Sequence, residues 1–392
     1  MTFYQGRQTI AAAHSPDKAT HRLEFLDALR GLAAFAVILQ HAGQNLSAGY
    51  SAFAFSIFDL GNFGVMVFFL CSGFIIPISL ERQGSLRSFW IRRFFRLFPL
   101  YWFCIALDLC LGYLSGWSRY PASFFAHPVS FILANLTMLQ NSFGFSDILG
   151  PAWTLPFELI FYFIVSIQFR MGLIKYTVLM AVSILLSAVL VEGVVPLTLG
   201  VRLPNGILSF YGTMFVGAVC YRYSTGEIRL ATLQRVLALA LITEVVTLLG
   251  DIQLGPVWFH WITARLLAYA VFIAALTFRK QFSARWLCGL GVISYSLYLV
   301  HPYPMALIAE LQSPWLTLCL WLGGIILLAS LTYRLVERPA IALGRRLTSA
   351  AVGASTLDIC DSGLAHTSAA SYPAPAGPPA APPIVPEKST VN

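Results

Sequence analysis

The chain has 392 residues, of which 58% are apolar and 11% charged, whereas an ordinary soluble domain has roughly 45–50% apolar and about 25% charged residues. This composition, with a mean hydropathy of +0.74, excludes a typical soluble globular protein. The net charge of +8 does not indicate a nucleic-acid partner, because the basic residues lie in short loops between apolar runs, where membrane topology explains them. We expect no nucleic-acid binding.

Apolar runs close to the length needed to cross about 30 Å of hydrocarbon recur along most of the chain. We therefore predict an all-α fold, a polytopic integral membrane bundle of about ten transmembrane helices. The expected helices span residues 25–45, 57–79, 97–115, 152–169, 174–192, 207–221, 233–250, 259–278, 287–309 and 315–335.

The chain is predicted to have three parts. Residues 1–24 form a polar tail that lacks the apolar core and cleavage site of a signal peptide. The transmembrane domain covers residues 25–346, and residues 347–392 form a tail rich in Ala, Ser and Pro that cannot build a core, so we expect it to be disordered. Any chemistry is therefore expected within the bundle.

The distribution of basic residues predicts the orientation of the bundle, because short positively charged loops resist translocation. With the N-terminus in the cytoplasm, 21 of the 25 lysine and arginine residues fall on the cytoplasmic side. Only Arg119 and Arg202 fall outside, and Arg30 and Arg265 lie within helices. We predict that both termini are cytoplasmic, and that the protein is a multi-pass protein of a bacterial inner membrane.

The first predicted helix carries three groups that are expensive in a bilayer, where each costs about 2.5–3.5 kcal/mol at mid-depth. Arg30 and His41 are eleven residues apart, so they share one helical face and are separated by roughly 16 Å along the axis. Asp27 precedes Arg30 by three residues and can pair with it. The alternatives are a core histidine bonded to a neighbouring helix, and an ion pair that only fixes helix depth.

The segment SFWIRRFFRLFPLYW places arginines at the cytoplasmic mouth of the third predicted helix. Arg93 and Arg96 are three residues apart on one face, a spacing suited to binding phosphates through charged, forked hydrogen bonds. An acyl-CoA or a nucleotide fits that description. The alternative is anchoring to lipid headgroups, for which aromatic residues and arginines are also typical.

Two further groups are candidates for the site. Glu158, in GPAWTLPFELIFYF, is the only ionisable residue of an apolar stretch, and it could orient an imidazole, accept a proton or bind a sugar hydroxyl. It could equally bond a neighbouring helix. In SYSLYLVHPY, Tyr295, Tyr298 and His301 recur every three residues, which indicates either a shared polar surface or an aromatic belt with a bend at the following proline.

Other groups in the sequence are interpreted as structural, and several known catalytic motifs are absent. Glu244 and Arg265 could pair between neighbouring helices. The seven cysteines are odd in number and lack metal-ligand spacing, so we expect no metal site. The sequence contains no phosphate-binding loop, nucleophile elbow or H-E-x-x-H pair, which argues against ATP-driven transport, serine hydrolysis and zinc proteolysis.

Four blocks together resemble the acyltransferase family 3 membrane proteins, over nearly all of residues 22–346. The blocks are FLDALRGLAAFAVILQH, FGVMVFFLCSGFII, SFWIRRFFRLFPLYW, and SYSLYLVHP with LVERPA. The most specific feature is an arginine followed eleven residues later by a histidine, beside an R-x-x-R pair. Within the family the chain is most similar to the standalone O-acetyltransferases of exopolysaccharides and nodulation factors.

The resemblance implies a membrane O-acyltransferase that moves an acyl group, by default acetyl, from cytoplasmic acyl-CoA to a hydroxyl of an extracytoplasmic or lipid-linked glycan. It implies that Arg93 and Arg96 bind the co-substrate, and that Arg30, His41 and Glu158 are catalytic. We add Asp27, Tyr298 and His301 as supporting residues. No permanently bound cofactor is expected; the expected partners are acyl-CoA, a carbohydrate, the lipid bilayer and polysaccharide-assembly proteins.

Two mechanisms follow from these residues. His41 acts either as general base on the acceptor hydroxyl, oriented by Glu158, or as a covalent acyl carrier. A secondary transporter or glycan exporter is the main alternative function, since it also needs ionisable groups at mid-depth. A scaffold that uses the proline-rich tail as a ligand is a third.

Overall fold

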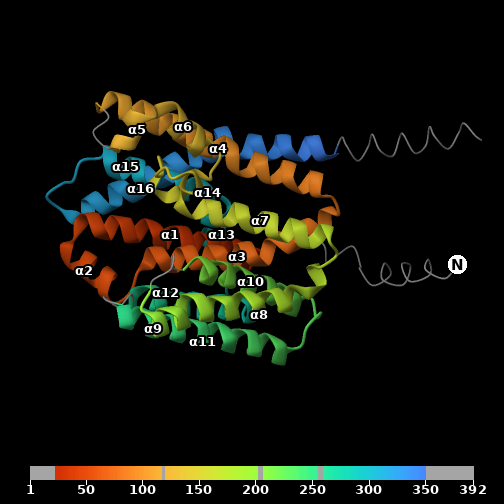
Figure 1. Cartoon of the computed structure of the whole chain (residues 1–392). Coiled ribbons are helices and arrows are strands. Elements are labelled where there is room, and N and C mark those ends of the chain that lie inside the picture. The colour runs from red at the N-terminus through yellow and green to blue at the C-terminus, as the bar shows by residue number, and fades with distance from the viewer. Residues whose placement is uncertain (1–22, 117–119, 202–205, 255–258, 350–392) are drawn as a thin grey trace, which may run out of the picture. The chain divides into compact units, whose positions relative to one another are not determined.

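A computed structural model of the chain describes residues 23–116, 120–201, 206–254 and 259–349. These residues form helices and contain no β-strand, which confirms the all-α membrane fold (Figure 1). The chain divides into two units, Met1–Arg345 and Arg346–Asn392, and the description below concerns the first. The predicted tails, 1–24 and 347–392, lie almost entirely outside the described residues.

Two long helices, α1 and α3, run side by side through the middle of the unit (Figure 1). Short 3-10 segments at Gln140–Phe143, Gly150–Thr154 and Ile174–Tyr176, and π-helical turns at Val189–Val194 and Tyr333–Glu337, connect or interrupt the helices. The α-helices are α1 (Glu24–Leu46), α2 (Ala48–Ser56), α3 (Leu60–Gln83), α4 (Leu86–Leu114), α5 (Ala122–Ala126), α6 (Pro128–Leu136), α7 (Leu155–Arg170), α8 (Thr177–Ala188), α9 (Val195–Leu199), α10 (Ile207–Ser224), α11 (Leu230–Leu254), α12 (Phe259–Thr277), α13 (Arg285–Val292), α14 (Ser294–Val300), α15 (Pro302–Leu307) and α16 (Pro314–Thr332).

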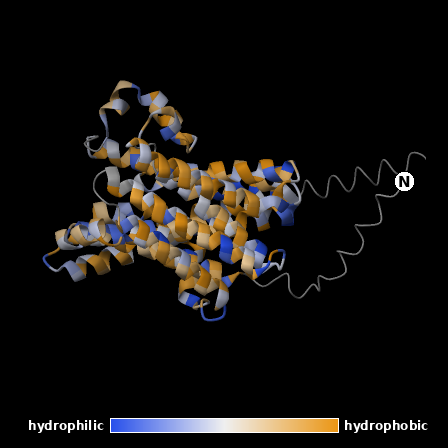
Figure 2. Cartoon of the chain, turned by 60° about the horizontal axis from the view of Figure 1, so that its bottom comes forward, coloured by the Kyte–Doolittle hydropathy of each residue, from blue (hydrophilic) through white to orange (hydrophobic). Residues whose placement is uncertain are grey.

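Eight helices within the described ranges are long and apolar enough to cross a membrane. Apolar residues follow the helices along their length, and polar residues gather toward the ends and connecting loops (Figure 2). Two of the ten predicted spans are not among the eight: α10, and the segment predicted as one helix over 287–309. The third span also begins earlier than predicted, at Leu86, because Ser85 caps the helix there by accepting a hydrogen bond from the backbone N–H of Ser88.

The prediction of one helix over residues 287–309 is wrong, because the structure divides this segment into α13, α14 and α15. The first break is at Ile293, whose backbone leaves the helical region at φ −99° and ψ 11°. The second follows His301, where Pro302 begins α15 and lacks the backbone N–H that would continue α14. The break places His301 at the end of a short helix inside the bundle.

Glycines allow the central helices to approach each other closely. A Cβ on Gly73 of α3 would lie 1.8 Å from the carbonyl oxygen of Met214 in α10. A Cβ on Gly291 of α13 would lie 1.8 Å from the carbonyl oxygen of Asp27 in α1. Backbone contact of this kind is the usual way in which helices pack in lipid, where apolar burial alone provides little driving force. It fixes α1, which carries Arg30 and His41, and α3, which carries Ser72.

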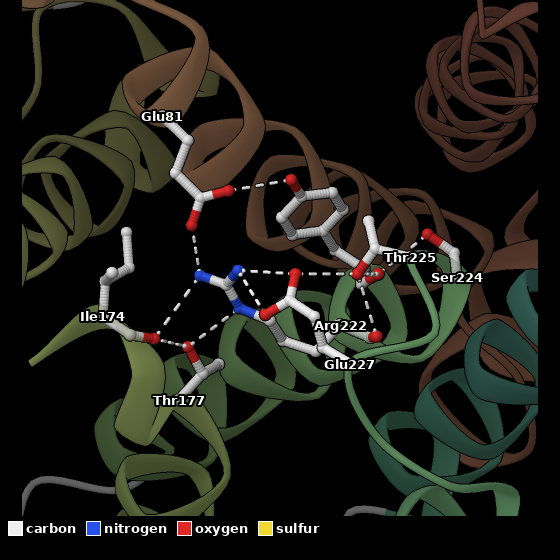
Figure 3. Close-up of polar contacts among 8 residues, drawn as sticks. Glu81, Ile174, Thr177, Arg222, Ser224, Thr225 and Glu227 are labelled. Atoms are coloured by element: carbon white, nitrogen blue, oxygen red, sulfur yellow. Dashed lines mark hydrogen bonds and ion pairs between the residues drawn. The ribbon is translucent and has the colours of Figure 1, made fainter. Parts of the chain in front are cut away.

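A buried arginine joins α3 to α10 and α8. The guanidinium of Arg222 forms ion pairs with Glu81 and with Glu227, the latter at 2.9 Å, and its Nε donates to Thr177 Oγ1 at 3.4 Å (Figure 3). Tyr221 OH donates to the second oxygen of Glu81 at 2.8 Å. These bonds satisfy a charge that would otherwise be costly to bury, and they hold the end of α3 that lies beside the arginine-rich cavities described below.

A second buried ion pair joins α11 to α12. Arg265 NH1 lies 3.1 Å from Glu244 Oε2 and 3.3 Å from Oε1, and both residues are less than a tenth exposed. The pairing predicted from the sequence is confirmed. It explains why both charges can be buried in the bundle, without a role in catalysis.

Candidate active site

Helix α1 carries the polar stripe predicted from the sequence. The helix is continuous from Glu24 to Leu46, so Arg30 and His41 lie on one face and are about 16 Å apart along the axis. Arg30 is half-buried and His41 is exposed. Each lines a different cavity, and these two cavities form the candidate site.

The first cavity, which we call the arginine cavity, has a volume of about 290 Å³ and is lined by Arg30, Arg93, Arg96, Ser72 and Glu158, among others. Arg92 and Arg345 also line it, and it shares all five of these arginines with a wider mouth of about 1030 Å³. The mouth is also lined by Asp27, Arg82, Glu337 and Arg338. The structure thus brings the predicted Arg30 together with the predicted Arg93 and Arg96, and places Asp27 beside them.

Helix α4 positions Arg93 and Arg96. Both arginines are half-buried, one helical turn apart, on the face of α4 that lines the arginine cavity. The guanidinium of Arg93 lies over the rings of Phe89 and Tyr162, at 5.4 Å and 5.3 Å from their centroids. Stacking on aromatic faces holds a guanidinium in a defined orientation, so Arg93 is pre-organised for an anion that enters the cavity.

Glu158 lies in the arginine cavity and not beside His41. Its Oε1 accepts hydrogen bonds from Ser72 Oγ at 2.9 Å and from Tyr162 OH at 2.5 Å. The predicted orienting contact from Glu158 to His41 is therefore wrong, because the face of α7 that carries Glu158 packs toward α3 and α4. The structure instead shows the alternative stated for this carboxylate, a hydrogen bond to a neighbouring helix, here α3 through Ser72. It also places the carboxylate among the arginines that line the cavity.

The second cavity, which we call the histidine cavity, has a volume of about 720 Å³ and contains both predicted histidines, His41 and His301. Their rings are stacked, with centroids 5.1 Å apart and planes inclined by 21°. His301 is 1% exposed, and its Nδ1 lies 2.9 Å from the carbonyl oxygen of Tyr298. Because a carbonyl only accepts, Nδ1 carries the ring hydrogen of a neutral His301. The stack fixes one face of the His41 imidazole.

Tyr298 stands between the two cavities. Tyr298 and Val65 line both of them. The phenol of Tyr298 is 5% exposed, and its OH is hydrogen-bonded to Thr154 Oγ1 at 2.9 Å. A molecule that reached from the arginines to His41 would pass this side chain. Tyr295, the other tyrosine of the motif, donates to the carbonyl oxygen of Leu97 at 2.8 Å and lines the arginine cavity.

Sequence reasoning gave no role to several residues of the site. Ser72 and Tyr162 hold Glu158, and Glu337, which is 1% exposed, accepts from Ser296 Oγ at 2.7 Å and lines the mouth. Ser72 and Glu337 lie in the blocks FGVMVFFLCSGFII and LVERPA, so the resemblance marked their segments without distinguishing them. In the part of the chain that the structure describes, no three His, Cys, Asp or Glu residues are arranged to hold a metal ion.

Together, the helical bundle and the two cavities define a membrane protein with one chamber lined by arginines and one chamber that contains an exposed imidazole. Residues 23–335 match the family model described as "Acyltransferase domain". The chain therefore belongs to this acyltransferase family, and the resemblance stated from the sequence motifs is confirmed.

Comparison with curated proteins gives relatives of varied coverage. Nodulation protein 10 of Rhizobium leguminosarum bv. viciae is 35% identical over 158 residues, which cover 36% of this chain and 42% of that protein. The O-acetyl transferase of Shigella phage Sf6 is 28% identical over 157 residues, which cover 38% and 46%. Exopolysaccharide production protein ExoZ of Rhizobium meliloti (strain 1021) is 26% identical over 310 residues, which cover 76% and 95%. The matches to the first two relatives thus span less than half of those proteins, and no solved structure matches the chain.

Proposed function

We propose that this protein is a membrane O-acyltransferase that transfers an acyl group, by default acetyl, from acyl-CoA to a hydroxyl of a carbohydrate. The observation that carries the proposal is the arrangement of two cavities along one face of α1, with Arg30 in one and His41 in the other. A two-substrate transfer needs separate sites for donor and acceptor that meet at a reactive group. The family supports the reaction class.

The arginine cavity and its mouth are suited to the donor. Coenzyme A carries phosphates, and Arg93 and Arg96 are two guanidinium groups on one helical face that can bind phosphates through forked, charged hydrogen bonds. Arg30, Arg92 and Arg345 add further cations to the same cavity. The pantetheine arm then extends past Tyr298 toward His41, and an extended arm can cover the roughly 16 Å between Arg30 and His41.

The histidine cavity is suited to the chemical step. The imidazole of His41 accepts the proton of the acceptor hydroxyl, and the hydroxyl oxygen attacks the thioester carbonyl carbon. The new C–O bond forms as the C–S bond breaks, so the products are the acyl ester and the CoA thiolate, which takes up a proton. His301 is a positioning residue, because it stacks on His41 and is itself held by the carbonyl oxygen of Tyr298.

The names of the relatives support the finer assignments. One is an O-acetyl transferase and another an exopolysaccharide production protein, which favours acetyl as the group and a polysaccharide precursor as the acceptor. The positive-inside rule predicts that the arginine mouth faces the cytoplasm, where acyl-CoA is available, and the proposed location is a bacterial inner membrane. The histidine cavity then faces outward, toward the glycan and the proteins that assemble it.

The test is transfer of radiolabel from acetyl-CoA to cell-envelope glycan in membranes that contain the wild type, His41→Ala or Arg170→Ala at matched expression. Arg170 is exposed at the end of α7 and lines neither cavity, so it is a control for the loss of a charge. We expect label on the glycan with the wild type and Arg170→Ala only. Equal labelling with His41→Ala would contradict the mechanism, and flux of unmodified glycan without labelling would favour a transporter.

A further inference from the structure

A π-helical turn, Tyr333–Glu337, follows α16 at the mouth of the arginine cavity. The backbone N–H of Arg338 donates to the carbonyl oxygen of Tyr333, five residues earlier. In an α-helix, residues five apart lie about 140° apart around the axis, whereas the i→i+5 bond of a π turn stacks them nearly one above the other. The turn therefore places Tyr333 and Arg338 on one face, and both line the mouth. Such turns are rare and are often found at functional sites.

The side chains of Tyr333 and Arg338 have no structural role in this turn. Tyr333 is half-buried and Arg338 is exposed. Within the described residues, neither side chain makes a hydrogen bond, an ion pair or a ring contact. Arg222 and Arg265, in contrast, are held in ion pairs. A ring and a guanidinium left free at the opening of a cavity are available to a ligand.

The mouth carries a large excess of positive charge. Its described lining includes seven arginines against the carboxylates of Asp27 and Glu337. The arginines are Arg30, Arg82, Arg92, Arg93, Arg96, Arg338 and Arg345. Five of them also line the arginine cavity, whereas Arg82 and Arg338 line the mouth alone. Cations are thus present at two depths, which suits a ligand with phosphates at two separate positions.

We propose that Tyr333 and Arg338 form the subsite for the 3′-phosphoadenosine end of coenzyme A. The adenine stacks on the ring of Tyr333, a contact that aromatic side chains make with any base. The 3′-phosphate pairs with the guanidinium of Arg338 through charged hydrogen bonds. Adenine and 3′-phosphate are attached to the same ribose, and the two side chains are one π turn apart on one face.

The remaining groups of coenzyme A follow in the order of the lining. Beyond the ribose, the diphosphate meets the arginines that the mouth shares with the arginine cavity, and the pantetheine arm continues inward. This inference rests on the proposed function and specifies its donor as a complete coenzyme A thioester. A thioester that carries only phosphopantetheine, as on a carrier protein, would lack the groups that Tyr333 and Arg338 bind.

The experiment compares acetyl-CoA with 3′-dephospho-acetyl-CoA, which differs only by the missing 3′-phosphate. Binding to purified full-length protein in lipid nanodiscs is measured by isothermal titration. Arg338→Ala removes the guanidinium, and Arg334→Ala is the matched control, because Arg334 is exposed in the same π turn and lines none of the cavities described. Tyr333→Leu removes the ring, whereas Tyr333→Phe keeps it.

We expect the wild type to bind acetyl-CoA about tenfold to a hundredfold more tightly than the dephospho compound. Arg338→Ala should bring the two affinities to within about threefold, by weakening acetyl-CoA alone. Unchanged binding of the dephospho compound then shows that this variant is folded. Arg334→Ala should keep the full preference. Tyr333→Leu should weaken both ligands at least about fivefold, and Tyr333→Phe should restore most of the affinity.

The outcomes separate this subsite from the proposed function. Equal wild-type affinity for the two thioesters would overturn the subsite and leave the proposed function intact, as would a preference that survives in Arg338→Ala. Binding of neither thioester would overturn both. A preference that depends on Arg338, without acetyl transfer to glycan, would contradict the proposed function but not the subsite.

Discussion

The arginine cavity and the histidine cavity lie along the same face of α1, yet their linings differ in almost every chemical respect. The arginine cavity contains Arg30, Arg93 and Arg96 with one carboxylate, Glu158, among them. Among the described residues, those that line the histidine cavity include His41, amides and tryptophans but no lysine or arginine. The arginines are suited to phosphates and a lining without lysine or arginine is not, so in the proposed function the arginine cavity is the donor side and the histidine cavity the acceptor side.

The comparison also shows how a membrane protein accommodates expensive groups. Two buried arginines that line neither cavity are held in ion pairs, Arg265 with Glu244 and Arg222 with Glu81. Those that line the cavities are held differently: Arg93 is held by aromatic faces and His41 is stacked on His301. Groups kept available in this way are the ones expected to act on ligands.

The largest effect should come from the reactive group of the histidine cavity. His41→Ala removes the proposed general base, and we expect the rate of acetyl transfer to fall by about a hundredfold to ten-thousandfold. Acetyl-CoA binding should be unchanged, because the arginine cavity is intact. Rates measured at saturating donor and acceptor check this, and a parallel loss of acetyl-CoA binding would show that the two cavities are not separate sites.

The next effect should come from the arginines. Arg93→Ala or Arg96→Ala removes a charged hydrogen bond to phosphate, typically worth about 1.5–3 kcal/mol, so we expect the KM for acetyl-CoA to rise about tenfold to a hundredfold. The KM for the acceptor should not change. Arg170→Ala is the control for charge, and an acceptor KM that rises with the donor KM would contradict the assignment of the arginines to the donor.

The packing of α13 against α1 offers a test of stability. Gly291→Ala places a Cβ 1.8 Å from the carbonyl oxygen of Asp27, whereas a Cβ on Gly289 of the same helix would have no atom within 4 Å. We expect Gly291→Ala to destabilise the protein by about 1–3 kcal/mol and Gly289→Ala to leave it unchanged. Thermal unfolding of the two variants in detergent measures the difference. Equal Tm values would show that α13 and α1 are not held by this contact.

The smallest effect should come from the carboxylate of the arginine cavity. Glu158→Gln removes a negative charge near bound phosphates, and a repulsion of about 1 kcal/mol corresponds to roughly fivefold tighter acetyl-CoA binding. Acceptor affinity should be unaffected, because Glu158 does not line the histidine cavity. Isothermal titration with acetyl-CoA measures the change, and a loss of acceptor affinity alone would restore the role first expected for this residue beside His41.

The elements that the sequence predicted well depend on local spacing. Helix α1 and the shared face of Arg30 and His41 follow from helical periodicity alone, and the pairing of Glu244 with Arg265 follows from the cost of unpaired charge in a bilayer. Arg93 and Arg96 are likewise three residues apart on one helix, and this spacing alone predicts that they share a face.

The elements that it missed depend on tertiary packing. The position of Glu158 depends on which way α7 faces when it packs on α3, which no local pattern determines. The break between α13 and α14 at Ile293 has no proline or glycine at that residue to predict it. The stacking of His41 on His301 joins residues 260 positions apart.

The most direct test of the separation of donor and acceptor sides uses sealed inside-out membrane vesicles that contain the protein. Radiolabelled acetyl-CoA is supplied only to the outer solution, which faces the predicted cytoplasmic side, and the acceptor oligosaccharide is either enclosed in the vesicle or added outside. We predict labelling of the enclosed oligosaccharide only, and its loss in His41→Ala. Labelling of oligosaccharide added outside sealed vesicles would contradict the account, because donor and acceptor would then enter from the same side.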